Sequence, residues 1–296
     1  MAHEHLTRRF ARTEEAIITL FCLVDDAYHH LNPRARCYES LKRLSDSEVI
    51  ALALFGQLRG IESERSFLRD AERFFSHLFP GVVGLHPSSF NRRVSKLRRF
   101  LEPLRQDVVS ELVGDPETLI VDSTLLSVLH PRQVEQSGGF EGAAWVRWGS
   151  FSVYGVKLHL LCATNRVPLS YELTAANVAE VRLTEELLVG ADLVGEDFLA
   201  RRLLGDLAYR SEGLQETLAD FGILVVTERS KQGGKRQQVE ICLASLKQVL
   251  GIGETLARTV VGLVTRIAAK ITAYTYAFLV NRRLGRPQGR IKELWA

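Results

Sequence analysis

The segment Thr118-Leu-Ile-Val-Asp-Ser-Thr-Leu-Leu-Ser-Val128 restricts the fold more than any other part of the sequence. Its leucines and β-branched residues predict a buried β-strand. Asp122 lies inside this strand, where an unpaired charge is costly. A carboxylate inside a buried strand indicates a functional site, where we expect a positively charged group beside Asp122.

Two more carboxylates occur at informative places. Asp206 ends the apolar segment that begins at Arg201, and Glu240 lies on an amphipathic helix predicted over residues 238–250. At ~100° per residue, Arg236, Glu240 and Lys247 share one edge of that helix. The apolar face beside this edge consists of Val239, Cys242, Leu243, Leu246 and Leu250. Glu240 could ligate a metal while the two cations hold phosphates, or it could be a surface glutamate in helix salt bridges.

The pattern around these carboxylates predicts an α/β fold. We expect strands over residues 118–128, 154–163, 168–174, 201–207 and 223–227, and helices over residues 181–189, 211–220, 238–250 and about 255–284. Three strands in succession, followed by alternating helices and strands, describe an α/β sheet that helices cover.

The first ~110 residues read as helical instead. Ser45 and Glu48 form a capping-box pattern ahead of an apolar run, and a second helix is expected from Glu64 to Leu78. A third, basic helix begins near Ser88 or Ser89 and carries Arg92, Arg93, Lys96, Arg98 and Arg99. This pattern is typical of a helix-turn-helix that touches DNA, and equally of a bundle helix with a basic solvent face.

Charge is distributed unevenly along the chain, although the net charge is only +3. Lys and Arg against Asp and Glu number 17 and 14 in residues 1–110, 8 and 17 in residues 111–220, and 13 and 4 in residues 221–296. An acidic middle could collect metal ions and a basic end could hold a polyanion, as in an enzyme that acts on nucleic acid. The alternative is that these runs are solvated faces.

The sequence argues against several classes of protein. The four cysteines are far apart, which favours neither a disulfide framework nor a zinc site. The polar N-terminus lacks the apolar core of a signal peptide. Arg258, Arg266 and Lys270 interrupt the most apolar late segment, so we expect a core helix, no membrane span and a cytoplasmic protein.

Three motifs together resemble the DDE transposases of bacterial insertion sequences. They are Ile120-Val-Asp-Ser-Thr124, Gly205-Asp-Leu-Ala-Tyr209 and Gln238-Val-Glu-Ile-Cys-Leu-Ala-Ser-Leu-Lys247. Arg236, Glu240 and Lys247 also match a signature of that family, which reads Tyr, two residues, Arg, three residues, Glu, six residues, Lys. The tyrosine of the signature is Gly233 here, so no role of that aromatic carries over.

The resemblance implies a ribonuclease H-like mixed five-stranded sheet flanked by helices, with an all-helical N-terminal domain. The expected domains are residues 1–112 for DNA binding, 113–284 for catalysis and 285–296 as a basic tail. Asp122, Asp206 and Glu240 would be catalytic and would bind two Mg²⁺ ions, which Mn²⁺ could replace. The implied partners are double-stranded DNA, as element ends and target, and a second copy of the chain in a homodimer.

Arg236 and Lys247 are expected to contact DNA, as are Arg92, Arg93 and Lys96. Alternation places Lys157 and His159 on one face of the second strand, where they could contact phosphate or serve only the fold. Trp145 or Trp148, in a glycine-rich loop, could stack on an unpaired base or pack the loop end. The tail could lie along DNA or be disordered.

The function that the sequence predicts is a transposase that binds terminal inverted repeats and performs metal-dependent phosphodiester hydrolysis and strand transfer. It would work in the bacterial cytoplasm, on the nucleoid. Two alternatives stay open. One is a catalytically silent DNA-binding repressor or domesticated relative, and the other is a structure-selective ribonuclease H-like nuclease.

Overall fold

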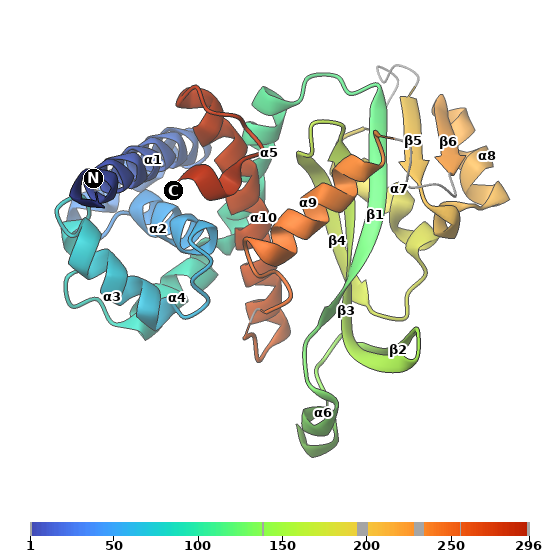
Figure 1. The fold of residues 1–296 in the computed structure, drawn as a ribbon, viewed down its shortest axis with the longest axis horizontal. Coiled ribbons are helices and arrows are strands. Elements are labelled where there is room, and N and C mark those ends of the chain that lie inside the picture. The colour runs from blue at the N-terminus through green and yellow to red at the C-terminus, as the bar shows by residue number, and fades with distance from the viewer. Residues whose placement is uncertain (1, 138, 194–200, 228–233, 255, 295–296) are drawn as a thin grey trace. The chain divides into compact units, whose positions relative to one another are not determined.

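The structure is a computed structural model that describes residues 2–137, 139–193, 201–227, 234–254 and 256–294 (Figure 1). Contacts divide the chain into two compact units. The helical unit comprises residues 1–108, 248–251 and 265–296, and the sheet unit comprises residues 109–247 and 252–264. Residues 265–284 therefore group with the helical unit, whereas the sequence assigns them to the catalytic domain.

Helices account for the first part of the chain, as predicted. They are α1 (Ala2–Leu31), α2 (Asp46–Leu58), α3 (Glu64–Phe75), α4 (Pro87–Leu97) and α5 (Leu101–Leu112), with the 3-10 turns η1 (Pro33–Leu41), η2 (Pro80–Val82) and η3 (Arg98–Phe100). The capping box at the start of α2 is confirmed. The Glu48 amide donates to the Ser45 hydroxyl at 3.0 Å, and the Ser45 amide donates to the Glu48 carboxylate at 2.6 Å.

The basic helix α4 is shorter than its charge pattern suggests. Pro87 begins it and the His86 ring caps it, because proline is well suited to the first helical position. The helix ends at Leu97, so Arg98 and Arg99 fall in η3. Arg92 and Lys96 are exposed, whereas Arg93 forms an ion pair with Asp46 at 2.7 Å. Arg93 is therefore engaged in an ion pair within the helical unit.

The late apolar segment forms α10 (Val260–Arg283). It is long and apolar enough to cross a bilayer, but 89% of its most apolar window is buried, which agrees with a core helix. Residues after it also pack, since Ile291 and Leu294 of η6 (Ile291–Leu294) are buried and Arg286 donates to the Leu294 carbonyl at 3.2 Å. The described part of the predicted tail is thus folded, because its two apolar residues reach the core.

The sheet unit contains six strands among its described residues. They are β1 (Thr118–Ser127), β2 (Ala144–Trp148), β3 (Phe151–Ala163), β4 (Pro168–Ala175), β5 (Arg201–Gly205) and β6 (Ile223–Thr227). Their order is β2-β3-β1-β5-β6, with β4 also paired to β3. β3 is antiparallel to β1, β2 and β4, whereas β5 is parallel to β1 and to β6. This is the mixed, ribonuclease H-like sheet that was expected.

The number of strands differs from the expectation of five. Residues 144–148, predicted to be loop, form β2, which pairs with residues 151–155 of β3 as a hairpin. Gly149 turns the hairpin at φ +61°, a conformation that glycine adopts without strain. The short helix α6 (Pro131–Ser137) was also not predicted. Because glycines flank residues 144–148, the sequence predicts a loop there, and the five-residue strand was not recognised.

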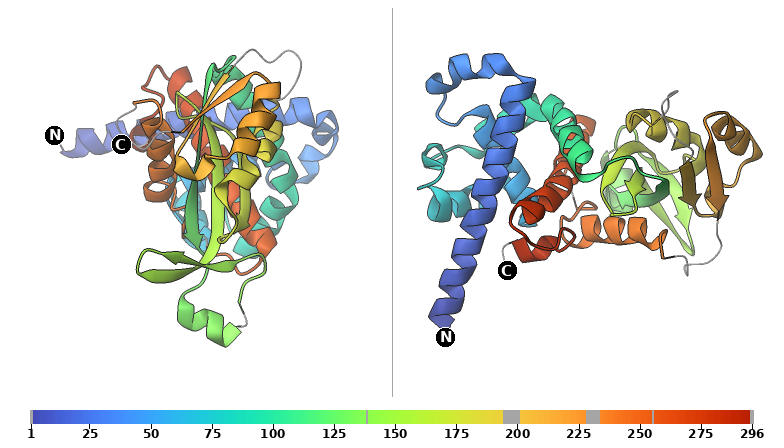
Figure 2. Two further views of the ribbon diagram at one scale, coloured as in Figure 1. Left: turned by 90° about the vertical axis from the view of Figure 1, so that its right-hand side faces the viewer. Right: turned by 90° about the horizontal axis from the view of Figure 1, so that it is seen from above.

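Helices cover both faces of the sheet. α7 (Thr184–Gly190), preceded by η4 (Glu180–Leu183), packs on β3 and β4, and α8 (Glu212–Asp220) packs on β6. α9 (Gln237–Gln248) lies on the side of the sheet opposite α7 (Figure 2). It buries Val239, Cys242, Leu243 and Leu246, the face that the sequence predicts.

Candidate active site

Asp122 lies in β1 at the point where the parallel pairing with β5 ends. That pairing covers Thr118 to Ile120, while the antiparallel pairing with β3 continues past Asp122, which lies opposite Leu160. The side chain is half-buried, and one of its oxygens accepts a hydrogen bond from the Ser123 amide at 2.8 Å. β1 thus holds the first carboxylate on the face that α9 covers.

Asp206 follows directly after β5 and caps the 3-10 turn η5 (Leu207–Tyr209). Its Oδ1 accepts from the Ala208 amide at 2.9 Å. Ile120 pairs with Leu204, so the alternation of both strands directs Asp122 and Asp206 to the same face of the sheet. The second carboxylate therefore reaches this face from the neighbouring strand.

Glu240 belongs to the first turn of α9. Arg236 donates to its Oε1 at 3.3 Å, which is the helix salt bridge that the sequence left open as an alternative. The edge that carries Glu240 and Arg236 lies near Asp122, because the charges of both side chains act on that carboxylate.

The other two carboxylates act on Asp122. Burial, together with the charges of Asp206 and Glu240, raises the pKa of Asp122 to about 6, against the Ser123 amide and Arg236, which lower it. Partial burial lowers the pKa of Lys247, and the charge of Asp122 opposes that change. Repulsion among carboxylates, only partly balanced by cations, is the state that a divalent cation would relieve.

The donor set suits a hard divalent cation. Ser123, Ala208 and Arg236 each hold one oxygen of Asp122, Asp206 and Glu240 respectively. Within the described residues, the second oxygen of each carboxylate accepts no hydrogen bond, so it is available as a ligand. Oxygen ligands are those that Mg²⁺ and Mn²⁺ prefer. In the same described part, however, no three His, Cys, Asp or Glu side chains are grouped to hold a metal ion.

Lys157 and His159 lie on the opposite face of the sheet from Asp122. His159 pairs with Ser123, so it shares the face of Ser123, and Lys157 follows the same alternation. Lys157 donates to Glu180 and to the Val178 carbonyl, both at 2.7 Å. Their predicted contact with phosphate finds no support in this placement. Alternation along one strand gives a common face, but only the register with β1 tells which face that is.

The interior position of His159 explains its charge state. The side chain is fully buried, and its Nε2 lies 2.9 Å from the Thr174 hydroxyl. Burial lowers the pKa of His159 to about 4, and Lys157 contributes in the same direction. The ring is therefore neutral at physiological pH and serves the fold.

The remaining sequence candidates lie elsewhere. The Trp145 ring lies 5.3 Å from that of Tyr154 on the β2–β3 hairpin and remains 44% exposed, so base stacking stays a prediction. Gly233 lies outside the described residues, and so does the side chain of Trp148. Arg92, Arg93 and Lys96 belong to the helical unit.

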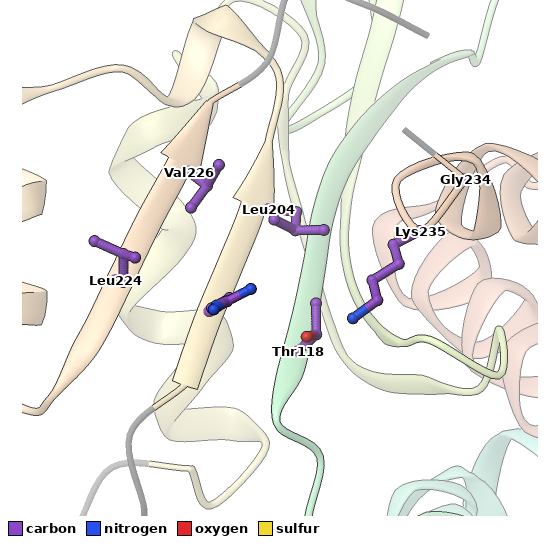
Figure 3. A pocket seen from close by; sticks show the side chains of 7 residues that line it. Thr118, Leu204, Leu224, Val226, Gly234 and Lys235 are labelled. Carbon is purple, nitrogen blue, oxygen red and sulfur yellow. The ribbon is translucent and has the colours of Figure 1, made fainter. Parts of the chain in front are cut away.

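A pocket of about 460 Å³ opens on the same face as Asp122 (Figure 3). Its lining consists of Thr118, Arg202, Leu204, Leu224, Val226, Gly234 and Lys235. Arg202 and Lys235 are exposed, and the lining contains no acidic residue among the described ones. Lys235 extends toward β1 in Figure 3. Sequence analysis missed both cations, although Lys235 precedes Arg236 and Arg202 alternates with Asp206.

Comparisons with known proteins show the family of this chain. Residues 113–276 match the family described as Transposase DDE domain. Among curated proteins, none matches the chain. A solved synaptic complex of the piggyBac transposase with hairpin DNA is 11% identical with a TM-score of 0.46, covering 85% of this chain and 70% of that one.

A second solved structure, the Mos1 mariner paired end complex with Mn, is 10% identical with a TM-score of 0.30. The similarity covers 80% of this chain and 78% of that chain. The family match includes all three acidic motifs and more than half of the residues. The chain therefore belongs to the DDE transposase family and is a DDE-type transposase.

Proposed function

We propose that this transposase binds the terminal inverted repeats of an insertion sequence, and that Asp122, Asp206 and Glu240 are its catalytic carboxylates. The main observation in support is that the charges of Asp206 and Glu240 both act on Asp122, on one face of the sheet. Each carboxylate also keeps an oxygen without a hydrogen bond among the described residues. These oxygens are the proposed ligands of two Mg²⁺ ions, which Mn²⁺ can replace.

When bound by these residues, the two ions would stabilise the charge that develops on a phosphodiester during its displacement. The protein contributes positioning. Arg236 orients Glu240 through one oxygen, and the Ser123 and Ala208 amides orient the two aspartates. Water is the proposed nucleophile when the element end is released, and the resulting 3′-hydroxyl is the nucleophile for joining to target DNA. One arrangement serves both steps because each is the same in-line displacement.

Cations on the catalytic face are proposed to hold the DNA backbone near the carboxylates. Lys247 is exposed on α9 and senses the charge of Asp122. Arg202 and Lys235 border the pocket beside β1. Phosphates are bound by such cations in any sequence, so these residues would contribute affinity and register without reading bases.

Recognition of the repeat is assigned to the helical unit, and in particular to the exposed Arg92 and Lys96 of α4. We also propose a homodimer, because transposition must bring two ends of one element together. The proposed location is the bacterial cytoplasm, where the element and its target lie.

The test is incubation of the full-length protein with DNA that carries the ends flanking its own gene, with Mg²⁺ or Mn²⁺, followed by mapping of the product ends. The proposal expects cleavage at the repeat and joined products. Asp122→Ala, Asp206→Ala and Glu240→Ala should each abolish cleavage, with DNA affinity and thermal stability largely kept.

The same assay separates the alternatives. A silent repressor would retard end-containing DNA in a gel without nicking it. A structure-selective nuclease would cut branched or hybrid DNA, show no preference for the repeat and produce no joined strands. Either pattern would reject the proposed function.

A further inference from the structure

A polar cluster lies behind the catalytic face, on the side of the sheet that faces η4. It consists of Ser123, Lys157, Glu180 and Tyr209, which we call the back cluster. The Glu180 carboxylate accepts from Lys157 at 2.7 Å and from the Ser123 hydroxyl at 3.4 Å. Lys157 is 9% exposed and Tyr209 is 1% exposed, whereas the side chain of Glu180 is 28% exposed, so the cluster is only partly closed to solvent.

Tyr209 adds a hydroxyl group to this cluster. The hydroxyl lies beside Ser123, but it has no hydrogen bond of ordinary geometry within the described residues. Burial raises the pKa of Tyr209, and the charges of Asp122, Asp206 and Glu180 raise it further. The group is therefore a neutral hydrogen-bond donor surrounded by carboxylates. A buried donor without a partner destabilises the fold, so a contribution to stability does not explain why this hydroxyl is present.

Both ends of the back cluster connect to a catalytic aspartate. Ser123 follows Asp122 in β1, and its amide orients the Asp122 carboxylate. Tyr209 closes the turn η5, which Asp206 caps. Glu180 begins η4, which packs against η5. The β1 segment is thus bonded to Glu180 through the Ser123 hydroxyl, and the η5 segment meets Glu180 through the packing of η4 on η5 and the charge that Glu180 exerts on Tyr209.

Stability alone does not account for a charged pair in this position. Moving an ion pair out of water costs about as much as the attraction returns, so an apolar pair of similar volume would serve the core equally well. Burial works to raise the pKa of Glu180, but Lys157 outweighs it and holds the pKa below its ordinary value. Glu180 therefore stays ionised and continues to accept hydrogen bonds.

We propose that Glu180, held by Lys157, is a positioning residue that fixes the spacing of Asp122 and Asp206 through Ser123 and Tyr209. The inference rests on the proposed function of the two aspartates as metal ligands. It assigns no ligand role to Glu180, which reaches the site only from behind the sheet.

Full-length Glu180→Gln and Tyr209→Phe test the proposal. Glutamine keeps the size of the side chain and removes its charge, and phenylalanine keeps the ring and removes the hydroxyl. The affinity of the DNA-free protein for Mn²⁺ can be measured by electron paramagnetic resonance. It should fall at least fivefold in Glu180→Gln and at least twofold in Tyr209→Phe. Cleavage at saturating Mn²⁺ should slow about tenfold in Glu180→Gln, with DNA affinity within twofold of the wild type.

A double variant distinguishes positioning from simple structural support. Lys157→Met with Glu180→Leu replaces the ion pair by an apolar pair, which should restore the thermal stability lost in Glu180→Gln. The proposal expects Mn²⁺ affinity to stay low in this double variant. Recovery of both stability and Mn²⁺ affinity would overturn it, as would wild-type Mn²⁺ affinity in Glu180→Gln.

Two controls match the changes elsewhere in the chain. Asp115→Asn breaks another ion pair of the sheet unit, with Arg201, and Tyr276→Phe removes another buried hydroxyl that lacks a partner among the described residues. Both should leave Mn²⁺ binding unchanged, and equal loss in them would reject a specific role for Glu180. If the wild type binds Mn²⁺ but never cleaves DNA, the proposed function fails while the binding series still decides the positioning role.

Discussion

The α-carbon of Gly205 lies against the ring of Tyr209, so closely that a β-carbon there would meet the ring at 2.9 Å. Tyr209 is fully buried and cannot swing into solvent. Gly205→Ala should therefore displace the ring and the turn that Asp206 caps, at a cost of about 1–3 kcal/mol of stability. Cleavage should fall as well.

Thermal unfolding and Mn²⁺ binding would check this prediction. Gly213→Ala is the matched control, because its β-carbon would come no closer than 3.9 Å to the Ser211 hydroxyl and alanine favours the helix. A stable, fully active Gly205→Ala protein would show that the contact is unimportant.

Asp122 should make the metal-free protein less stable as pH rises. Its pKa is about 6 in the folded protein, against an ordinary value of 3.8, so the folded state binds more protons between pH 4 and pH 6. Stability from this group is present below pH 4 and is lost as pH rises through 6. Asp122→Asn should thus stabilise the apo protein by on the order of 2 kcal/mol at pH 7.5, and negligibly below pH 4.

Urea unfolding across pH, without divalent ions, would measure that difference. Asp220→Asn, at an exposed position at the end of α8, should show little change. Adding Mg²⁺ or Mn²⁺ at pH 7.5 should stabilise the wild type and not Asp122→Asn. A constant gap between the two proteins at all pH values would contradict the raised pKa.

Cation binding by the metal site should tighten over the same pH range. Below pH 6 a proton competes for Asp122, so apparent Mn²⁺ affinity should rise with pH and become nearly constant above about 7. Titrations of Mn²⁺ at several pH values would test this. A midpoint near 4 would mean that burial and the neighbouring carboxylates leave Asp122 unperturbed.

Arg202 and Lys235 should contribute phosphate contacts. Loss of one contact lowers the slope of log affinity against log salt by about 0.9. Arg202→Ala or Lys235→Ala should therefore weaken DNA binding and reduce the slope by roughly that amount, with little dependence on sequence. Arg132→Ala, at an exposed site on α6, is the control. An unchanged slope would remove the pocket from the DNA path.

The basic residues of α4 should separate into two groups. Burial works to raise the pKa of Asp46, but Lys42 and Arg93 outweigh it and hold the pKa below its ordinary value. Arg93→Ala should thus destabilise the helical unit by about 1 kcal/mol. Arg92→Ala and Lys96→Ala, at exposed positions, should keep stability and weaken binding of the repeat. Calorimetry with gel-shift assays on repeat and random DNA would separate stability from recognition.

Local signals in the sequence were enough for much of the fold. The Ser45–Glu48 capping box and the apolar face of α9 depend on neighbouring residues only, and both were predicted. The motifs around Asp122, Asp206 and Glu240 were likewise recognisable from their neighbouring residues. Strand β2 was missed because the glycines that flank it indicate a loop, although its Trp and Val residues favour a strand.

The parts of the site that depend on strand register could not be predicted from the sequence. Lys157 and Asp122 lie on opposite faces only because His159 pairs with Ser123. Arg202 joins the catalytic face because it pairs with Thr118 across a parallel crossover. Such pairings bring together residues about 40 to 80 positions apart, and periodicity within a single strand does not specify them.

The early end of the β1–β5 pairing has a mechanical consequence. Among the described residues, three pairs, Thr118–Arg202, Leu119–Leu203 and Ile120–Leu204, join these strands, whereas β1 keeps its ladder with β3 as far as Ser127. The weakest seam of the sheet consequently runs between the two aspartates. Beyond Ile120 no ladder pair of the described strands sets the separation of Asp122 and Asp206, so side chains packed behind the sheet have to set it.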